Sequence, residues 1–348
     1  MEKILTVVIP TYNMEKYLNR CLSSLVVEPD WMDKLEVLVV NDGSKDRSQA
    51  IAQVYESQYP RTFKVIDKEN GNYGSCINAA LSVATGKYVK VLDADDWFDS
   101  KAFIDYLSLL NTTDVDFVFN GMYIVDGSGN VLERHCFEDR LTESTIISFK
   151  EYAEKMNGAG VYMQNVAYQL QCLKKMAYRQ TEGISYTDQE WLFVPLFAVS
   201  TVAYYSSPLY YYQVGRSGQT IDYDTHIKNM WMEVSVTKNL VNAYEKYKDG
   251  IQEITESRYI LGRLMSRICF LYSTYLLSSR DKLNVDELID FDKFLLETDC
   301  YLYTESNKIA ARFGVKYVKA WRRNYTFTNI TYLLIRLKQL MSSTLNRI

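Results

Sequence analysis

Clustered metal-binding thiols and imidazoles are missing from this sequence. Its 348 residues include only two histidines and six cysteines, and no two cysteines form a C-x-x-C pair. Structural zinc sites need thiolate or imidazole ligands at close spacing, so the sequence argues against one. Cys21 and Cys76 fall on apolar faces of predicted helices, which is typical of small buried side chains in a reducing compartment.

Long hydrophobic runs are also missing. No stretch reaches the roughly 18 uncharged apolar residues of a spanning helix. The opening MEKILTVVIP has no extended apolar core of the kind found in signal peptides. We therefore expect no transmembrane helix, and a location in the cytoplasm or at the cytosolic face of a membrane. Apolar residues make up 47% and charged residues 24%, the proportions of a globular protein, so long disordered regions are not expected.

The formal net charge of −4 is unevenly distributed. Residues 304–348 hold nine basic residues and one acid, a net of +8, which leaves −12 on the rest. An acidic body argues against a general nucleic-acid-binding surface. Apolar residues from Phe327 to Leu345 recur at spacings of three and four, which predicts an amphipathic helix. Contact of 304–348 with a membrane, docking on the body and homo-oligomerisation remain open alternatives.

Strand and helix patterns alternate over the first 120 residues. Four short apolar runs are separated by segments with helical periodicity; the runs are ILTVVIP, LEVLVV, FKVID and KYVKVLD. This order predicts a parallel sheet with right-handed crossovers and helices on both faces. Because ligands of such sheets bind beyond the carboxyl ends of the strands, the segments PTYN, NDGS and DADD are expected along one rim.

The pattern changes after Asp116. DFVFNGMYIV and VLERHCF flank the turn DGSGN and predict a hairpin. A helix around SFKEYAEKM, an irregular segment, a helix from Gln189 to Val199 and strands near TVAYYS and LYYYQV follow. From about Asp224 the pattern is almost wholly helical. We predict two parts, 1–222 with a sheet, whose acceptor side is about 120–222, and 223–348 with helices.

Four aspartates cluster directly after the fourth predicted strand. Mn²⁺ and Mg²⁺ prefer carboxylate oxygens, commonly use one or two protein carboxylates, and take further ligands from substrate phosphates. We predict that Asp95 and Asp93 hold such an ion, with Asp96 as a third candidate. Asp99 is better explained as the cap of the next helix. The alternative is that all four are turn and cap residues.

Two further turns carry weaker signals. NDGS has the composition of an ordinary turn. If the segment is functional, Asp42 would accept a hydrogen bond from a base or ribose. NGNYGS, residues 70–75, has two glycines before a helix, as a close approach of backbone to phosphate needs. It matches neither G-x-G-x-x-G nor G-x-x-x-x-G-K-[ST], so neither a dinucleotide site nor an NTPase loop is supported.

VVIPTYN, VVNDGS, GNYGSCINAAL and GKYVKVLDADDW together, in this order and spacing, resemble the nucleotide-sugar domain of family 2 inverting glycosyltransferases of the bacterial surface or capsular polysaccharide type. The resemblance covers residues 1–125 well and continues more loosely to about 220. It implies the GT-A fold, which is α/β and Rossmann-like with a mostly parallel sheet flanked by helices, and an α-helical C-terminal region.

The resemblance also implies donor-binding roles. The segment matching PTYN borders the nucleotide, the residue matching Asp42 binds the base, and the acidic motif holds a metal on the diphosphate. Many members have an Arg-Asn pair where this chain has Ile77-Asn78, which puts a basic donor contact there in doubt. The donor-binding residues expected here are Pro10, Thr11, Tyr12, Asn13, Asp42, Asn72, Gly74, Asn78, Asp93, Ala94, Asp95 and Arg216.

A catalytic base is implied in the segment SYTDQEW, where family members often show a Glu-Asp pair. Asp188 is the predicted base and Glu190 the reserve, since a carboxylate must remove the proton of the attacking hydroxyl. Capping of the helix WLFVPLFAV explains Asp188 equally well. Arg216, in a Gly-flanked loop, is either a clamp for phosphate or an ordinary turn charge. His135 and His226 match no part of the family pattern and receive no role.

The sequence thus predicts an inverting, metal-assisted glycosyltransferase. It would move a sugar from a UDP-sugar to a hydroxyl of a surface glycan or lipid-linked oligosaccharide, with Mn²⁺ or Mg²⁺. Two alternatives remain open. A sugar-phosphate nucleotidyltransferase also has an α/β sheet and an acidic metal site, although it usually begins with a Gly-rich basic loop. A non-catalytic glycan-binding protein would bind acceptor without UDP.

Overall fold

The computed structural model describes residues 2–143, 145–215, 223–278, 282–310 and 314–326. The chain divides into two compact units. The first comprises Met1–Gln219 with Gln252–Glu256, and the second comprises Thr220–Ile251 with Ser257–Ile348. Each unit is described by itself below. The predicted change of character near residue 222 lies among residues outside the described ranges.

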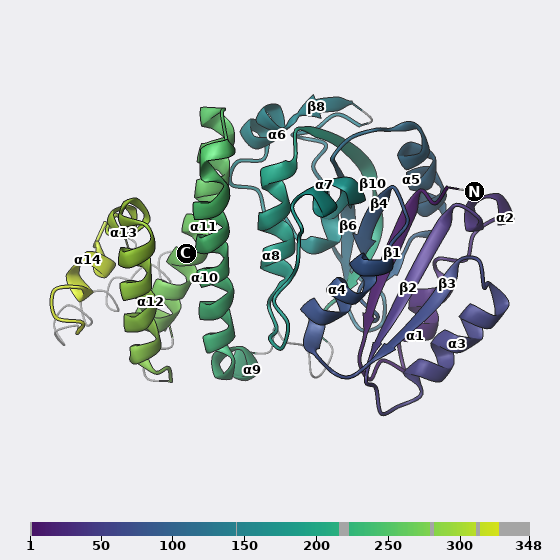
Figure 1. Ribbon diagram of the computed structural model, residues 1–348, viewed down its shortest axis with the longest axis horizontal. Helices are drawn as coiled ribbons and strands as arrows, with labels where there is room; N and C mark the ends of the chain where they lie inside the picture. Colours follow the sequence, from purple (N-terminus) through teal and green to yellow (C-terminus); the bar gives the residue numbers. More distant parts are fainter. Residues whose placement is uncertain (1, 144, 216–222, 279–281, 311–313, 327–348) are drawn as a thin grey trace, which may run out of the picture. The chain divides into compact units, whose positions relative to one another are not determined.

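A single mixed sheet organises the first unit (Figure 1). Its strand order is β3-β2-β1-β4-β9-β6-β10-β5, with β7 paired to β6 and β8 to β10. The strands are β1 Leu5–Thr11, β2 Leu35–Asp42, β3 Phe63–Lys68, β4 Tyr88–Val91, β5 Trp97–Phe98, β6 Phe117–Val125, β7 Val131–His135, β8 Ile146–Ser148, β9 Val166–Gln169 and β10 Thr201–Gln213.

The four predicted N-terminal strands are parallel to one another, as expected, and β6 and β10 form a second parallel pair in the sheet. β1 lies between β2 and β4, and β3 pairs with β2. Each connection between two parallel strands must return the chain to the same end of the sheet, and here helices make these connections. They cover both faces of the sheet. α1 (Leu18–Ser23), α3 (Ser48–Gln58) and α5 (Ser100–Thr112) pack into one core with β1 and β2, whereas α4 (Asn72–Val83) is not part of that core and packs on β1 and β2 separately.

Beyond β4 the sheet departs from the sequence expectation. Strand β9 lies between β4 and β6 and is antiparallel to both. It was not predicted, because its four residues are too few to show a strand periodicity. The hairpin of β6 and β7 forms as predicted. The two strands expected near TVAYYS and LYYYQV are one strand, β10, because a register shift between Tyr205 and Pro208 absorbs the break in pattern without ending the strand.

Short helices fill the connections of the first unit. Asp99 caps α5, as predicted, with its side chain accepting a bond of 2.9 Å from the Ala102 amide. The helix expected from Gln189 to Val199 is divided into α8 (Asp188–Phe193) and the 3₁₀ turn η2 (Val194–Ala198), which has Pro195 in its first turn. The other connections are α2 Pro29–Met32, α6 Phe149–Lys155, η1 Met163–Asn165 and α7 Leu170–Lys175.

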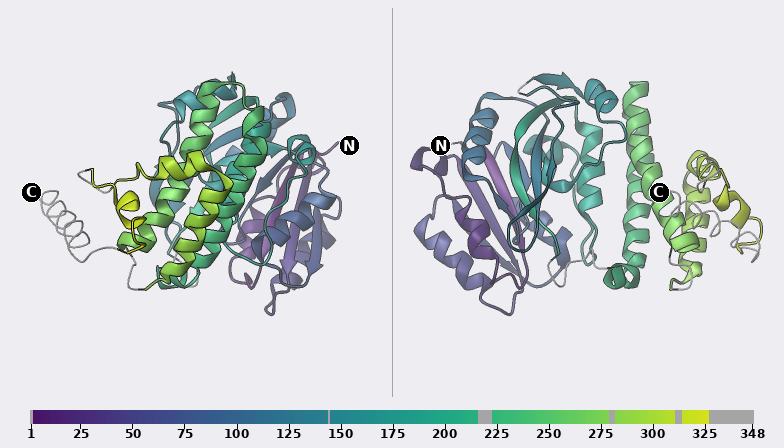
Figure 2. Two further views of the ribbon diagram at one scale, coloured as in Figure 1. Left: turned by 60° about the vertical axis from the view of Figure 1, so that its left-hand side comes forward. Right: turned by 180° about the vertical axis from the view of Figure 1, so that it is seen from behind.

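The second unit is helical over its described residues, as the sequence predicted (Figure 2). Arg322, at the end of α14, forms an ion pair of 2.7 Å with the fully buried Asp292. The helices are α9 Tyr223–Lys228, α10 Met230–Tyr247, η3 Lys248–Gly250, α11 Ile254–Ser273, η4 Thr274–Ser278, α12 Val285–Thr298, α13 Cys300–Ser306 and α14 Tyr317–Trp321. Within the described ranges, no helix is both long and apolar enough to cross a membrane. The predicted amphipathic helix at 327–348 lies outside those ranges.

Candidate active site at the carboxyl ends of the parallel strands

The loops after β1 and β2 are bound to each other at one rim of the sheet. The Asn13 amide donates to Ser44 Oγ at 3.1 Å, and the Lys45 amide donates to Asn13 Oδ1 at 2.8 Å. Asn13 adopts a positive φ of 54°, which Asn tolerates better than most residues. PTYN and NDGS therefore form one surface, on which Tyr12 is exposed and Thr11 is buried.

Asp42, at the end of β2, is buried and has a basic neighbour that the sequence pattern did not reveal. Lys68 Nζ donates to Asp42 Oδ1 at 2.7 Å and to Ser75 Oγ at 2.8 Å. The Gly71 amide donates to the same carboxylate oxygen at 2.9 Å. Asp42 thus fixes the glycine loop at the start of α4, and Lys68 places a cation beside it.

Asp93 begins the acidic loop after β4, and both of its oxygens accept hydrogen bonds. Tyr73 Oη, on α4, donates to Oδ1 at 2.8 Å, and Gln164 Nε2, in η1, donates to Oδ2 at 3.2 Å. Burial, followed by the negative charge of Asp95, raises the pKa of Asp93 to about 7.

Asp96, whose role the sequence left open, is hydrogen-bonded to strand β10. Tyr210 Oη donates to its Oδ2 at 2.8 Å, and the Gln213 amide donates to its Oδ1 at 2.7 Å. Both donors belong to β10. Burial raises the pKa of Asp96 well above its usual value, and the charge of Asp93 adds to this. Both oxygens of Asp96 are thus bound to β10, whereas those of Asp93 are bound to α4 and η1.

Asp95 and Ala94 are buried between these two aspartates, and an arginine from α1 lies beside them. Arg20 Nη2 donates to the Asp95 carbonyl at 3.2 Å and also to the side chain of Gln213. Its guanidinium lies 3.6 Å above the ring of Trp97, a cation–π contact. Sequence periodicity missed this role because Arg20 lies off the apolar stripe of its helix.

Asp188 is half-buried in the first turn of α8 and is not the cap of that helix. Thr187 occupies the N-cap position, so the capping alternative for Asp188 does not describe the structure. Helix α8 packs against η1, whose Gln164 donates to Asp93. Burial and then the charge of Asp95 raise the pKa of Asp93, and the charge of Asp188 makes a smaller contribution in the same direction. Gln189 Nε2 donates to Asp188 Oδ2 at 2.9 Å.

Glu190, the reserve base, is buried and bound elsewhere. Its two oxygens accept bonds of 2.7 Å from the amide and the hydroxyl of Thr181. It therefore anchors the segment before α8 to that helix. Among the two carboxylates predicted as base, Asp188 is the one whose charge acts on the acidic loop.

The segment around Thr181 also explains two of the predicted donor-binding residues of α4. A Cβ on Gly74 would lie 2.0 Å from the Thr181 carbonyl oxygen, so this glycine permits the helix and the segment to touch. Asn78 donates to the Gln180 carbonyl at 2.8 Å and accepts from the Gln180 amide at 2.9 Å. Asn72, by contrast, starts α4 at the rim with a φ of 65°.

Three further residues near the acids were not predicted from the sequence, namely Tyr73, Gln164 and Tyr212. Burial raises the pKa of Tyr212, followed by the charges of Asp93 and the other loop acids. The two tyrosines, on α4 and β10, could not be distinguished from the other tyrosines of a chain that has 29, and Gln164, in η1, belongs to no motif. Arg216 lies outside the described residues.

Metal binding at the acidic loop would depend on few protein ligands. No group of three or more His, Cys, Asp or Glu suited to a metal occurs in the described part of the chain. Carboxylate oxygens nevertheless suit Mn²⁺ and Mg²⁺, which often bind through one or two carboxylates with substrate phosphates. Asp95 and Asp93, two positions apart in the loop directly after β4, fit that minimal set.

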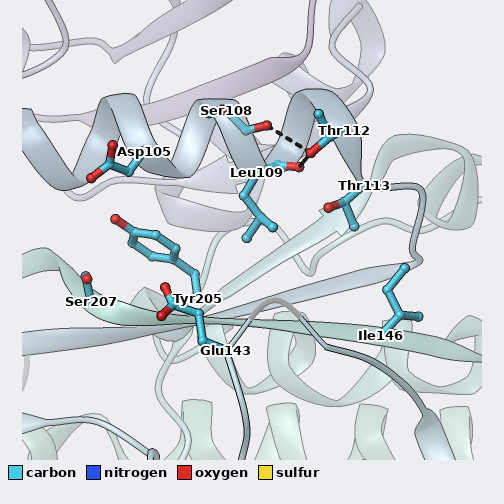
Figure 3. Close-up of a pocket in the computed structure, with 9 residues that line it drawn as sticks. All are labelled: Asp105, Ser108, Leu109, Thr112, Thr113, Glu143, Ile146, Tyr205 and Ser207. Carbon is cyan, nitrogen blue, oxygen red and sulfur yellow. Dashed lines mark hydrogen bonds between the residues drawn. The ribbon is translucent and has the colours of Figure 1, made fainter.

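A polar pocket in the same unit is separate from these residues. It has a volume of about 560 Å³ and lies between α5 and β10. Asp105, Ser108 and Thr112 of α5 line one side, and Tyr205 of β10 lines the other (Figure 3). None of the predicted site residues lines it, so the pocket contributes nothing to the site at the rim.

The family model described as "Glycosyl transferase family 2" matches residues 6–170. Over 102 residues the chain is 41% identical to the "Uncharacterized glycosyltransferase MG025 homolog" of Mycoplasma pneumoniae, covering 29% of this chain and 34% of that protein. Over 124 residues it is 29% identical to "Minor teichoic acid biosynthesis protein GgaB" of Bacillus subtilis, covering 35% and 14%. The chain thus spans about a third or less of the length of these relatives.

Two solved structures are similar in fold. S. aureus TarS 1-349, solved in complex with UDP-GlcNAc, aligns with a TM-score of 0.66 at 18% identity, over 94% of this chain and 93% of that chain. Mannosyltransferase PcManGT from Pyrobaculum calidifontis, in complex with GDP-Man and Mn²⁺, aligns with a TM-score of 0.51 at 15% identity, over 86% and 82%. The predicted fold class, with a helical C-terminal region, is confirmed.

The contact of Gly74 with Thr181 yields a stability prediction. Gly74→Ala should lower the free energy of unfolding by about 1–3 kcal/mol, because the new methyl group must displace a backbone carbonyl. Gly262→Ala is the matched control, since this helical glycine of α11 has open space around it. There alanine should add up to about 1 kcal/mol. Urea unfolding of both variants measures the difference, and equal effects at the two sites would contradict the packing argument.

Proposed function

Since residues 6–170 form a glycosyl transferase family 2 domain, as their sequence motifs indicated, we propose that this chain transfers a sugar from a UDP-sugar to an acceptor hydroxyl. The observation that carries the proposal is that α8, which begins at Asp188, packs against η1, whose Gln164 donates to Asp93 Oδ2 at 3.2 Å. Asp188 and Asp93 are 95 positions apart in the sequence. A base and a diphosphate-binding motif at one rim are what this reaction requires.

Asp188 is proposed as the general base. Its carboxylate accepts the proton of the acceptor hydroxyl while the hydroxyl oxygen attacks the anomeric carbon. The bond from that carbon to the UDP oxygen breaks at the opposite side, so a single displacement inverts the configuration. Glu190, whose two oxygens accept from Thr181, holds the segment before α8 to that helix and so helps to fix the place of Asp188.

Donor binding is proposed for the rim formed by PTYN, Asp42 and the acidic loop. Asp42 would accept from the base, and Asp95 with Asp93 would hold Mn²⁺ or Mg²⁺, which neutralises charge on the leaving diphosphate. Lys68 and Arg20 add positive charge at this rim. The nucleotide sugars bound to the two solved structures of similar fold support a donor of this class, and UDP-GlcNAc is a first donor to test.

The acceptor is proposed to be a hydroxyl of a surface glycan or lipid-linked oligosaccharide. The similarity to a teichoic acid biosynthesis protein supports this class of acceptor. Such an acceptor would be met at the cytosolic face of the membrane, where the basic residues of 304–348 would favour anionic lipid. Membrane contact and homo-oligomerisation through that segment remain predictions.

Asp188→Asn should lower kcat about 10²–10⁴-fold, the usual contribution of a positioned base, and leave the affinity for UDP-sugar close to that of the wild type. The measurement is UDP release from a panel of UDP-sugars with a glycan acceptor. Asp286→Asn, which changes an exposed first-turn acid of α12, is the matched control and should leave turnover unaltered. Wild-type turnover in Asp188→Asn would remove this residue as the base.

Asp95→Asn should reduce the effect of Mn²⁺ or Mg²⁺ on UDP affinity. One contact to a charged group contributes about 1.5–3 kcal/mol, so the metal-dependent gain in affinity should fall about tenfold or more. Calorimetric titration of UDP with and without metal measures this independently of turnover. Asp105→Asn, on the exposed face of α5, is the control. If UDP binds equally well to Asp95→Asn in both conditions, Asp95 does not hold the metal.

A further inference from the structure

Lys90, in the middle of β4, is completely buried. Its ammonium group donates to Asn120 Oδ1 at 2.7 Å, to the Gln164 carbonyl at 2.9 Å and to the Val166 carbonyl at 3.3 Å. Within the described residues it has no carboxylate at salt-bridge distance. A buried cation without a counter-ion is costly, and burial lowers the pKa of Lys90 well below its usual value.

Packing alone does not explain a lysine at this position. The other residues of β4 are buried and apolar, and Val166 and Ala167 of the adjacent β9 are buried as well. Leucine or methionine at position 90 would fill a similar volume without the cost of removing a charge from water. The reason for Lys90 must therefore lie in the three oxygens that it binds.

One of the three oxygens belongs to Gln164, a residue that also contacts Asp93. Lys90 binds the main chain of Gln164, and the side chain of Gln164 donates to Asp93 Oδ2 at 3.2 Å. Asn120 reinforces the arrangement, because its Nδ2 also donates to the Gln164 carbonyl, at 3.2 Å. Asn165 Nδ2 donates in turn to the Asn120 carbonyl at 2.9 Å. Hydrogen bonds from Lys90 of β4 and to and from Asn120 of β6 thus hold the turn η1 in the position in which Gln164 reaches the acidic loop.

We propose that Lys90 is a positioning residue for Asp93: by fixing η1 it holds Gln164 against the carboxylate and so sets the orientation of the donor-binding acids. This inference rests on the proposed function, since the orientation of Asp93 matters because Asp93 and Asp95 bind the donor diphosphate with its metal. Lys90 itself reaches neither substrate nor metal. Its effect travels through two hydrogen bonds and one side chain.

The test separates positioning from mere structural support. Lys90→Met keeps the length and removes both the charge and the three bonds. Loss of a residue that orients a ligand-binding group typically costs 10–100-fold, so the metal-dependent affinity for UDP and kcat/KM for the donor should fall about tenfold or more. The Tm should stay within roughly 3 °C of the wild type, because removing a buried charge offsets the acceptor left unpaired on Asn120.

Lys87→Met is the matched control on the same segment. Lys87 lies just before β4 and is half-exposed, with its ammonium group bound to the Thr113 carbonyl at 2.7 Å at the opposite end of the strand from the acids. The same change of residue type should leave UDP affinity and turnover unaltered there. Gln164→Leu provides the second route to the same break, and it should reduce UDP affinity in the presence of Mn²⁺ as Lys90→Met does.

Combining Lys90→Met with Gln164→Leu tests the proposed route. If Lys90 acts through Gln164, the double variant should lose little more affinity than either single variant. Additive losses, wild-type UDP binding by Lys90→Met, or a Lys90→Met protein that is unfolded or much less stable would each overturn the inference. If the wild-type chain transfers sugar and Lys90→Met binds UDP and transfers sugar equally well, this inference alone is overturned. A wild-type chain that neither binds UDP nor transfers sugar overturns the proposed function, and this inference with it.

Discussion

Carboxylates that lie close together at the end of a buried strand require hydrogen-bond donors in place of water. The acidic loop after β4 meets this requirement with donors that the chain supplies from distant places: Tyr73 on α4, Gln164 in η1 and Tyr210 on β10. Each donor ties the loop to a different element of the first unit. Burying the acidic loop without these donors would leave its carboxylates without hydrogen bonds, which is costly. The packing of α4, η1 and β10 around the loop therefore depends on these hydrogen bonds.

The same requirement gives the three aspartates different chemistry. Asp96 has both oxygens bound to β10 and fastens the last strand to the loop, close to where Arg20 also reaches Gln213. Asp93 accepts instead from α4 and η1, and burial, followed by the charge of Asp95, raises its pKa. The loop therefore joins three elements of the first unit, and the proposed metal site would use residues that also hold the fold together.

The parallel strands β1 to β4 could be predicted from the sequence because β1, β2 and β4 are almost wholly buried and therefore rich in apolar residues, while the edge strand β3 still follows the alternation of strands and helices. The topology also predicted that Asp42 and Asp93 lie where strands β2 and β4 end. Partnerships that depend on side chains crossing between distant elements could not be predicted: Glu190 with Thr181, or Asn78 with Gln180, have no local pattern. The antiparallel β9 was missed for a related reason, since four residues between a 3₁₀ turn and a helix are too few to show a period.

Helix α4 connects the donor side of the rim with the proposed base. Its start is held by Asp42 through the Gly71 amide, and its middle binds the segment before α8 through Gly74 and Asn78. That segment is fastened to α8 by Glu190, two residues after Asp188. The two glycines of NGNYGS therefore have separate tasks: Gly71 donates its amide to Asp42, and Gly74 lets the helix touch the segment that leads to Asp188.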